Sequence, residues 1–478
     1  MKRIYLICLV LCCQTALAQK NQLKDLKKIV KEVNSHSQAY ERLQYSTENL
    51  GHRLTGSENG RKAEEYAHDL LKSYGLDVSY QPFTSDSWSR ESLDLSIQNK
   101  AIKSVALAHS PVQVDLTADL MDMGNGLEAD YQKVGDQIKG KIALVYLGIL
   151  PNSGDGLRNL HRSEKTALAE KYGAKGIIFI NTVKNNVLLT GTASITGKLI
   201  NIPAICIGLE DGMAWKDYLK TNTTSAKIQM RNKAGLTTSR NIVVHIKGKE
   251  LPNEKIVVGG HLDSWDLATG AIDNGIGSFA IIDMARTFKK LKLKTKRSID
   301  FVLFMGEEQG LLGSKAYVEN AQKEGTIDQI KYMLNFDMVN APTGFSTIRY
   351  DMMHNLNEWG KSYALVDTTF KNNNASGAGL HSDHQPFMLQ GIPTGSARGG
   401  RLPNNAGMYY HSDNDVFSLV DKAGLLQTVR VGTAYTYFLA NAPEIVAKKL
   451  TDLEIRDFLE KADLKTPLQI SGEWRWGN

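Results

Sequence analysis

A histidine and several carboxylates stand directly after apolar segments in the second half of the chain. Ile256-Val257-Val258 is typical of a buried strand, and two similar apolar segments cover 301–305 and 332–336. In an open parallel sheet, ligands bind beyond the carboxyl ends of the strands. We therefore expect the polar side chains after these segments to meet at one edge of a sheet. They are His261, Asp263, Asp273, Glu307, Glu308 and Asp337, with a second histidine, His411, much later in the chain.

Nitrogen and oxygen ligands without cysteine suit zinc or a similar divalent metal. The adjacent pair Glu307-Glu308 is informative in a second way, because two neighbouring carboxylates can have different chemical roles. One can hold a metal while the other remains free as the general base for a metal-bound water. Each residue alone has an ordinary structural explanation, such as a helix cap at Asp273. Their occurrence together, after successive apolar segments, favours a metal centre.

The order of these residues resembles that of the two-zinc exopeptidases, the family of aminopeptidase Y and glutamate carboxypeptidase. Within the family, residues 261–273 are most similar to the carboxypeptidase Q group, and the resemblance covers nearly all of the mature chain. It implies two zinc ions that share a bridging hydroxide. The resemblance implies that His261 and Asp337 bind one zinc and that Glu308 and His411 bind the other, with Asp273 bridging the two. It further implies that Glu307 is the general base. Asp263 would orient the imidazole of His261.

Four further residues are candidates for contacts with the substrate. Asp383 lies in a segment, 381–387, that resembles a stretch near the cleft of the family. Arg398 and Arg401 lie in a Gly-rich loop before His411, where a guanidinium can bind a terminal carboxylate with two hydrogen bonds. Tyr410 can donate a hydrogen bond to the developing oxyanion. Ordinary packing is the alternative for the tyrosine, and an exposed mobile loop is the alternative for the arginines.

Strands that alternate with helices predict an α/β catalytic domain with a central, mostly parallel sheet flanked by helices, as in the zinc-exopeptidase fold. Segments 138–145 and 202–205 resemble a protease-associated domain, which is β-rich and would be inserted into the catalytic domain. We expect it to cover the cleft and restrict substrate size. The predicted divisions are a signal peptide (1–18), the catalytic domain in two parts (19–105 and 237–445), the inserted domain (106–236) and a C-terminal tail (446–478).

The N-terminus has the pattern of a cleavable signal peptide: a basic start, a short apolar run and Ala16-Leu17-Ala18 before Gln19. The apolar run is too short to span a membrane. We therefore expect a secreted or periplasmic protein. After cleavage only Cys206 remains, so no intrachain disulfide can form. The formal net charge of +6 over 478 residues shows no clustering that would indicate a nucleic-acid partner.

The sequence thus predicts a secreted metallopeptidase that hydrolyses dipeptides or short peptides from an end, in the manner of carboxypeptidase Q. Two enzymatic alternatives stay open: an aminopeptidase of the same family, and a glutaminyl cyclase-like transferase with a single zinc. A noncatalytic receptor-like protein is a third, although such a protein would be expected to lose metal ligands. Peptide substrates are the expected partners, and a homodimer is left open.

Overall fold

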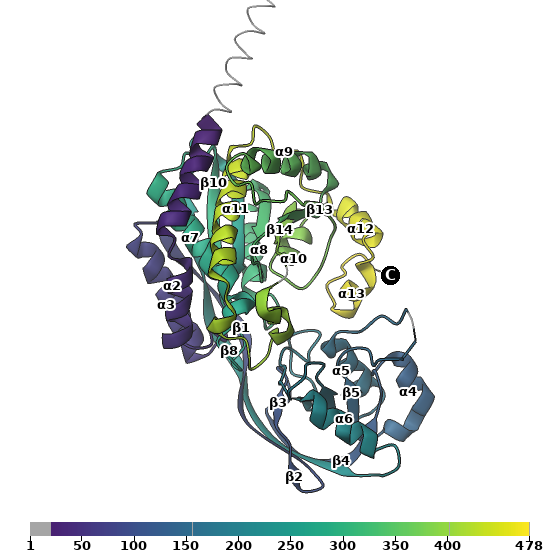
Figure 1. Cartoon of the computed structure of the whole chain (residues 1–478). Helices are drawn as coiled ribbons and strands as arrows, with labels where there is room; N and C mark the ends of the chain where they lie inside the picture. The colour runs from purple at the N-terminus through teal and green to yellow at the C-terminus, as the bar shows by residue number, and fades with distance from the viewer. Residues whose placement is uncertain (1–20, 155, 401, 478) are drawn as a thin grey trace, which may run out of the picture.

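The computed structural model describes residues 21–154, 156–400 and 402–477, and the predicted signal peptide lies outside these ranges. Figure 1 shows two lobes joined by a pair of long strands. The larger lobe is the predicted α/β domain. The smaller lobe is formed by the residues between the two long strands, which places it as an insertion in the larger one.

The centre of the larger lobe is a mixed sheet in which four neighbouring strands run parallel. Its register pairs His261 with Phe304 and Gly259 with Asn335, so the carboxyl ends of three strands are nearly level. The strand order is β13 (Ala375–Ser376), β12 (Gly344–Thr347), β14 (Thr394–Arg398), β11 (Ile330–Asn335), β9 (Leu251–His261), β10 (Arg297–Phe304), β8 (Ser225–Ile246) and β1 (Val78–Ile97). The expected mostly parallel sheet is thereby confirmed.

Helices cover both faces of this sheet because its inner strands are apolar on both sides. Ile256 and Val258 belong to the core on one face, whereas Val257 belongs to the core on the other. The first face is covered by residues 21–36, which are helical, and by α2 (Ala39–Asn49), α3 (Glu58–Ser73), α7 (Ile276–Leu291), α9 (Met353–Ala364) and α11 (Lys422–Asn441). The second is covered by α8 (Leu312–Lys323) and α10 (His384–Met388).

Helix α7 follows the turn that carries Asp273 and is almost completely buried. All residues from Ile276 to Phe288 are buried, including Ser278, Asp283 and Arg286. Burial on every side is expected of a helix that packs on the sheet with one face and under other helices with the opposite one. The start of α7, and with it the turn 271–275, is therefore held rigidly against the sheet.

The smaller lobe has its own sheet, reached through the antiparallel pair β1 and β8. Its inner strands are short and almost wholly apolar. The order is β4 (Gln113–Asp122), β5 (Ile142–Tyr146), β6 (Gly176–Ile180), β7 (Ala204–Ile207) and β3 (Ser104–Ala106), with β2 (Lys100–Ala101) beside β1 and helices α4 (Glu128–Val134), α5 (Arg162–Lys171) and α6 (Leu209–Tyr218) outside. Strand β8 passes the predicted boundary at 236/237 without a break.

The C-terminal tail forms two short helices, α12 (Asp452–Lys461) and α13 (Lys465–Ile470), on the larger lobe. Cys206 is buried in β7 and is free. Within the described residues, no helix has the length and hydropathy that crossing a membrane requires.

Candidate metal centre

Five residues predicted as metal ligands meet at the carboxyl ends of the parallel strands. His261 is the last residue of β9, and Asp273 lies in the turn Ala271–Gly275 between β9 and α7. Glu308 follows β10, and Asp337 follows β11. His411 comes from a loop far along the chain and has a φ of 55°. The fold therefore gathers side chains that are up to 150 residues apart in sequence.

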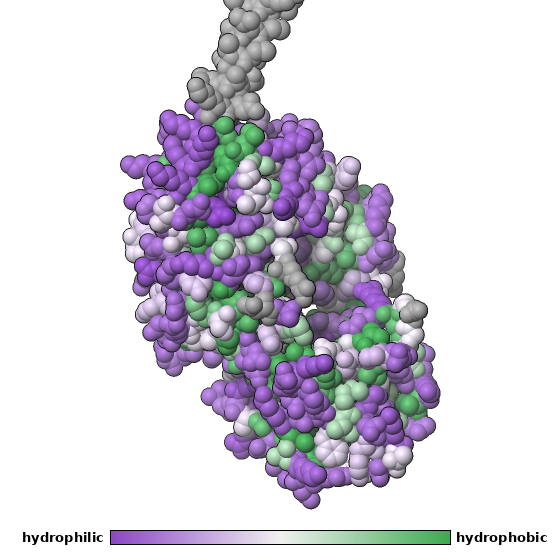
Figure 2. Space-filling view, viewed as in Figure 1, coloured by the Kyte–Doolittle hydropathy of each residue, from purple (hydrophilic) through white to green (hydrophobic). Residues whose placement is uncertain are grey.

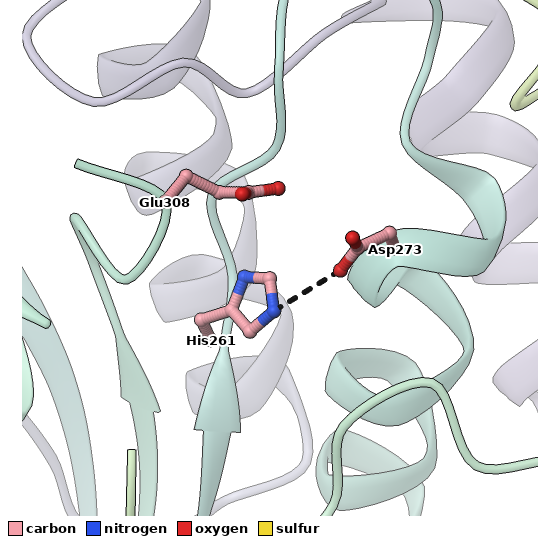
Figure 3. A group of neighbouring side chains, drawn as sticks. All are labelled: His261, Asp273 and Glu308. Atoms are coloured by element: carbon pink, nitrogen blue, oxygen red, sulfur yellow. Dashed lines mark ion pairs between the residues drawn. The ribbon is translucent and has the colours of Figure 1, made fainter. Parts of the chain in front are cut away.

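Asp273 stands between the two imidazoles. Its Oδ1 lies 3.3 Å from Nε2 of His261, and its Oδ2 lies 3.2 Å from Nε2 of His411. Asp337 Oδ1 lies 3.4 Å from the same nitrogen of His261, and Glu308 Oε2 lies 2.9 Å from that of His411. Figure 3 shows His261, Asp273 and Glu308 turned toward one another. The five side chains thus form two groups that share one carboxylate.

The donor set fits divalent metal ions. Ligand atoms of His261, Asp273 and Glu308 all lie within 4.8 Å of one another, and all three residues are buried. Glu308 Oε1 is buried and forms no hydrogen bond with any described residue. A buried carboxylate oxygen without a partner is costly unless a cation neutralises it. Imidazole and carboxylate ligands without cysteine suit zinc.

Hydrogen bonds around the ligands hold them in place. Nδ1 of His261 lies 3.0 Å from the backbone oxygen of Asp263 and 3.6 Å from its Oδ1. The Asp263 carboxylate accepts from the backbone N–H groups of Glu307 and Glu308, at 3.2 and 3.4 Å. Asp263 therefore contacts both the imidazole and the backbone that carries the glutamate pair. The sequence had led us to expect only the first of these two contacts, in which Asp263 orients the imidazole of His261.

Two supporting residues escaped the reasoning from sequence. Asp415 accepts hydrogen bonds from the backbone N–H groups of Ile272 and Asp273, at 2.7 and 3.0 Å. Ser382 donates to Oδ2 of Asp337 at 2.8 Å. Both lie close in sequence to residues that the analysis did single out, His411 and Asp383. Neither has a composition or spacing that would identify it before the fold is known.

Arg53 is a third supporting residue, and it is completely buried. Its guanidinium donates to the backbone oxygens of Leu262, Thr269 and Gly270. These carbonyls belong to the loop that links His261 to Asp273. Only the structure assigns this arginine to the loop. Arg53 therefore fixes the path of the chain between two ligands.

Glu307 lies beside the ligands and is half-buried. Burial raises the pKa of its carboxyl group well above the ordinary value, and the charges of Glu308, Asp337 and Asp383 act in the same direction, whereas that of His261 opposes them. Bound cations would stabilise the carboxylate form. The protonation state of Glu307 therefore depends on the charges around it.

The four candidates for substrate contact differ in their burial and in their neighbours. Asp383 is completely buried, and neither carboxylate oxygen has a hydrogen bond to a described residue. Burial raises the pKa of Asp383 to about 7, although the charge of His261 opposes this. Tyr410 stacks on His411 with ring centroids 3.7 Å apart. Arg398 ends β14 and is half-buried, and Arg401 lies outside the described residues.

The smaller lobe supplies an arginine that the sequence analysis did not consider. Arg162, the first residue of α5, is buried, and its Nη2 lies 3.2 Å from Nδ1 of His411. Its Nε donates to the backbone oxygen of Thr192 at 3.1 Å. A Cβ on Gly191 would lie 1.9 Å from Nη2, so only glycine leaves room for the guanidinium there. No carboxylate in the described part of the chain forms an ion pair with it.

Comparisons with known proteins agree with this geometry. Residues 241–436 match the model of peptidase family M28, and residues 112–215 match that of the PA domain. Carboxypeptidase Q of Xenopus laevis is 27% identical over 448 residues, which cover 89% of this chain and 91% of that protein.

Two solved structures are similar over most of the chain. A peptidase M28 precursor from Shewanella amazonensis has a TM-score of 0.78 at 23% identity and covers 91% of this chain and 100% of its own, which shows the fold. A zinc aminopeptidase from Bacillus subtilis has a TM-score of 0.67 at 27% identity, with 87% of this chain and 97% of its own covered.

Proposed function

The chain belongs to peptidase family M28 and is a zinc-dependent exopeptidase, and from this premise we propose that it hydrolyses dipeptides and other short peptides at a dinuclear centre. The observation that carries the proposal is the position of Asp273, whose two carboxylate oxygens each face a different imidazole. A carboxylate so placed can bridge two ions, each of which has one histidine and one further carboxylate beside it.

His261 and Asp337 would hold one ion, and Glu308 and His411 the other. Bound there, two divalent ions would polarise a scissile carbonyl and make a water more acidic. Glu307, beside these ligands, would accept a proton from the attacking water and return it to the departing amine. Asp263, Ser382 and Asp415 keep the surrounding groups in position through the hydrogen bonds described above. Tyr410 stacks on His411, and its hydroxyl would donate a hydrogen bond to the oxyanion.

The preferred end of the substrate is inferred from a buried charge, Arg162, that forms no ion pair with any described residue. Arg162 brings a buried guanidinium to the metal centre, and a buried cation needs an anion nearby. The free carboxylate of a short peptide would supply it, which supports carboxypeptidase or dipeptidase activity. Arg398 and Arg401 remain additional candidates for the same role. The identified relatives include both carboxypeptidase Q and zinc aminopeptidases, so aminopeptidase activity is the main alternative.

Metal content and substrate preference together test the proposal. Elemental analysis of purified protein after mild dialysis should give close to two divalent ions per chain, with zinc the expected metal. Unblocked dipeptides should be hydrolysed, and chelation should abolish this activity. A firm value of one ion with full activity would contradict the dinuclear centre. One ion without peptide hydrolysis would favour a glutaminyl cyclase-like transferase. Rapid cleavage of C-terminal amides, with none after N-acetylation, would indicate an aminopeptidase.

We further propose that the protein is exported and acts outside the cytoplasm, in the periplasm or the medium. The basis is the N-terminal pattern that ends at Ala18, which lies outside the described residues. Peptides are its partners. Homodimer formation stays a prediction to be tested by the mass of the protein in solution.

A further inference from the structure

The C-terminal segment, residues 451–476, packs on the larger lobe, on the side toward the smaller lobe. Ile455, Leu459 and Leu468 are buried against Met388 and Leu389 of the catalytic domain. The segment lies beyond both regions that match family models, which end at residues 215 and 436. The family match therefore assigns it no role.

A cavity of about 310 Å³ lies where this segment, the catalytic domain and the smaller lobe meet. His161 and Thr192 line it from the smaller lobe, Gln309 from the catalytic domain, and Ile470 and Glu473 from the C-terminal segment. Figure 1 shows α13 on the side of the larger lobe that faces α5, and Figure 2 shows a hollow where the lobes meet. The cavity thus has three walls, one of which is the C-terminal segment.

The cavity lies next to the metal centre. Gln309 directly follows Glu308 in the chain, and His161 directly precedes Arg162, which contacts His411. A third lining residue, His381, directly precedes Ser382, which bonds to Asp337. The rings of His161 and His381 stack across the interface between the lobes, with centroids 5.9 Å apart. A peptide whose scissile bond is at the metals would therefore extend into this cavity.

Glu473 fastens the C-terminal segment to the cavity. Its Oε1 pairs with Nζ of Lys315 on α8 at 3.1 Å, and its Oε2 accepts from Nε2 of Gln385 on α10 at 2.7 Å. Oε1 of Gln385 in turn accepts from the backbone N–H of His381 at 2.7 Å. One carboxylate thus holds the segment against two elements of the catalytic domain that line the cavity.

We propose that the C-terminal segment is the end wall of the substrate cleft and restricts hydrolysis to short peptides. This inference rests on the proposed function. The cavity is at the lower limit of the roughly 300–1,000 Å³ found for small-molecule sites, and each added residue of an extended peptide requires about 3.3–3.6 Å more length. A longer peptide would contact this wall, and displacing the wall would break the bonds of Glu473.

The test uses a series of free di-, tri- and tetrapeptides with the full-length holoenzyme. The kcat/KM of the wild type should fall by at least about tenfold from di- to tetrapeptide. Glu473→Ala should release the wall and raise kcat/KM for the tetrapeptide by at least about threefold, with dipeptide hydrolysis within about twofold of wild type. Ile470→Trp should fill the cavity and lower tripeptide hydrolysis more than dipeptide hydrolysis.

Glu460→Ala is the matched control, because Glu460 is a glutamate of the same segment that pairs with Lys465 and does not line the cavity. It should leave the length dependence unchanged. Zinc content and melting temperature identify any variant that acts through general damage. Parallel changes for all peptide lengths in both cavity variants would overturn this inference, as would a wild type that is indifferent to length. A wild type that hydrolyses none of the peptides would overturn the proposed function itself.

Discussion

Nδ1 of His411 lies 3.2 Å from Nη2 of Arg162, so a residue of the inserted lobe contacts a residue of the metal centre. A backbone hydrogen bond connects the same two segments: the N–H of Thr190 donates to the backbone oxygen of His411 at 2.8 Å. The inserted domain had been expected to cover the cleft. The structure shows that it touches the loop that carries His411.

We predict that Arg162 discriminates free peptides from their amides. Arg162→Met keeps an apolar side chain of similar length and removes the charge, so kcat/KM for free dipeptides should fall at least about tenfold, or about 1.4 kcal/mol. Hydrolysis of dipeptide amides, which have no carboxylate to bind, should change little. Arg231→Met removes an exposed arginine of β8 and serves as the control. Equal losses on acids and amides would show that Arg162 acts only through His411.

We predict that Glu307 is needed for catalysis and that its neighbour Glu308 is needed for metal binding. Glu307→Gln should keep both metals and lose at least about 10²-fold in kcat, because a general base is removed. Glu308→Gln should lose metal occupancy instead, since its Oε2 faces the same nitrogen of His411 as Asp273 does. Elemental analysis and turnover are measured on both variants. Near-native turnover of Glu307→Gln would exclude it as the base.

We predict an acid-sensitive contribution to stability from Asp300, far from the metal centre. Burial alone would raise the pKa of this carboxyl group, but hydrogen bonds from His245, Lys255 and Tyr317 and the charge of Lys255 outweigh it and hold the pKa below its usual value. A lowered pKa in the folded state stabilises the fold above the unfolded pKa of about 3.9. This contribution is lost as the pH falls through the folded value.

Asp300→Asn should therefore lower the free energy of unfolding by about 1–3 kcal/mol at pH 7 and flatten its dependence on pH below about 4. Urea unfolding at several pH values measures both. Asp328→Asn is the control, because Asp328 is an exposed aspartate paired with Lys449 on the surface, and its loss should cost less than about 1 kcal/mol. Identical pH profiles for Asp300→Asn and wild type would contradict the assignment.

We predict that the mature protein begins at Gln19. The basic start and the small residues at Ala16 and Ala18 form a cleavage pattern for export. N-terminal sequencing of protein from the extracytoplasmic fraction should read from Gln19. Recovery of a cytosolic protein that retains Met1 would refute export.

The sequence was sufficient for the catalytic fold and for the residues that meet at the centre. Parallel strands end on the same side of a sheet, so the pattern predicted that the side chains after the apolar strands, such as His261, Glu308 and Asp337, gather at one edge. The resemblance to the two-zinc exopeptidases added Asp273 and His411, which do not directly follow a strand.

Other relationships depended on contacts between segments that are distant in the chain. No local pattern marks Arg53 as the donor to three carbonyls of the ligand loop, or Asp415 as the acceptor that fixes Asp273. Arg162 looks like an ordinary first residue of a helix in another domain, and Glu473 like a polar residue of a tail. Local sequence sets hydrophobic periodicity and strand ends. Only the packing of two lobes and a C-terminal segment decides which buried charges and which walls surround the metal centre.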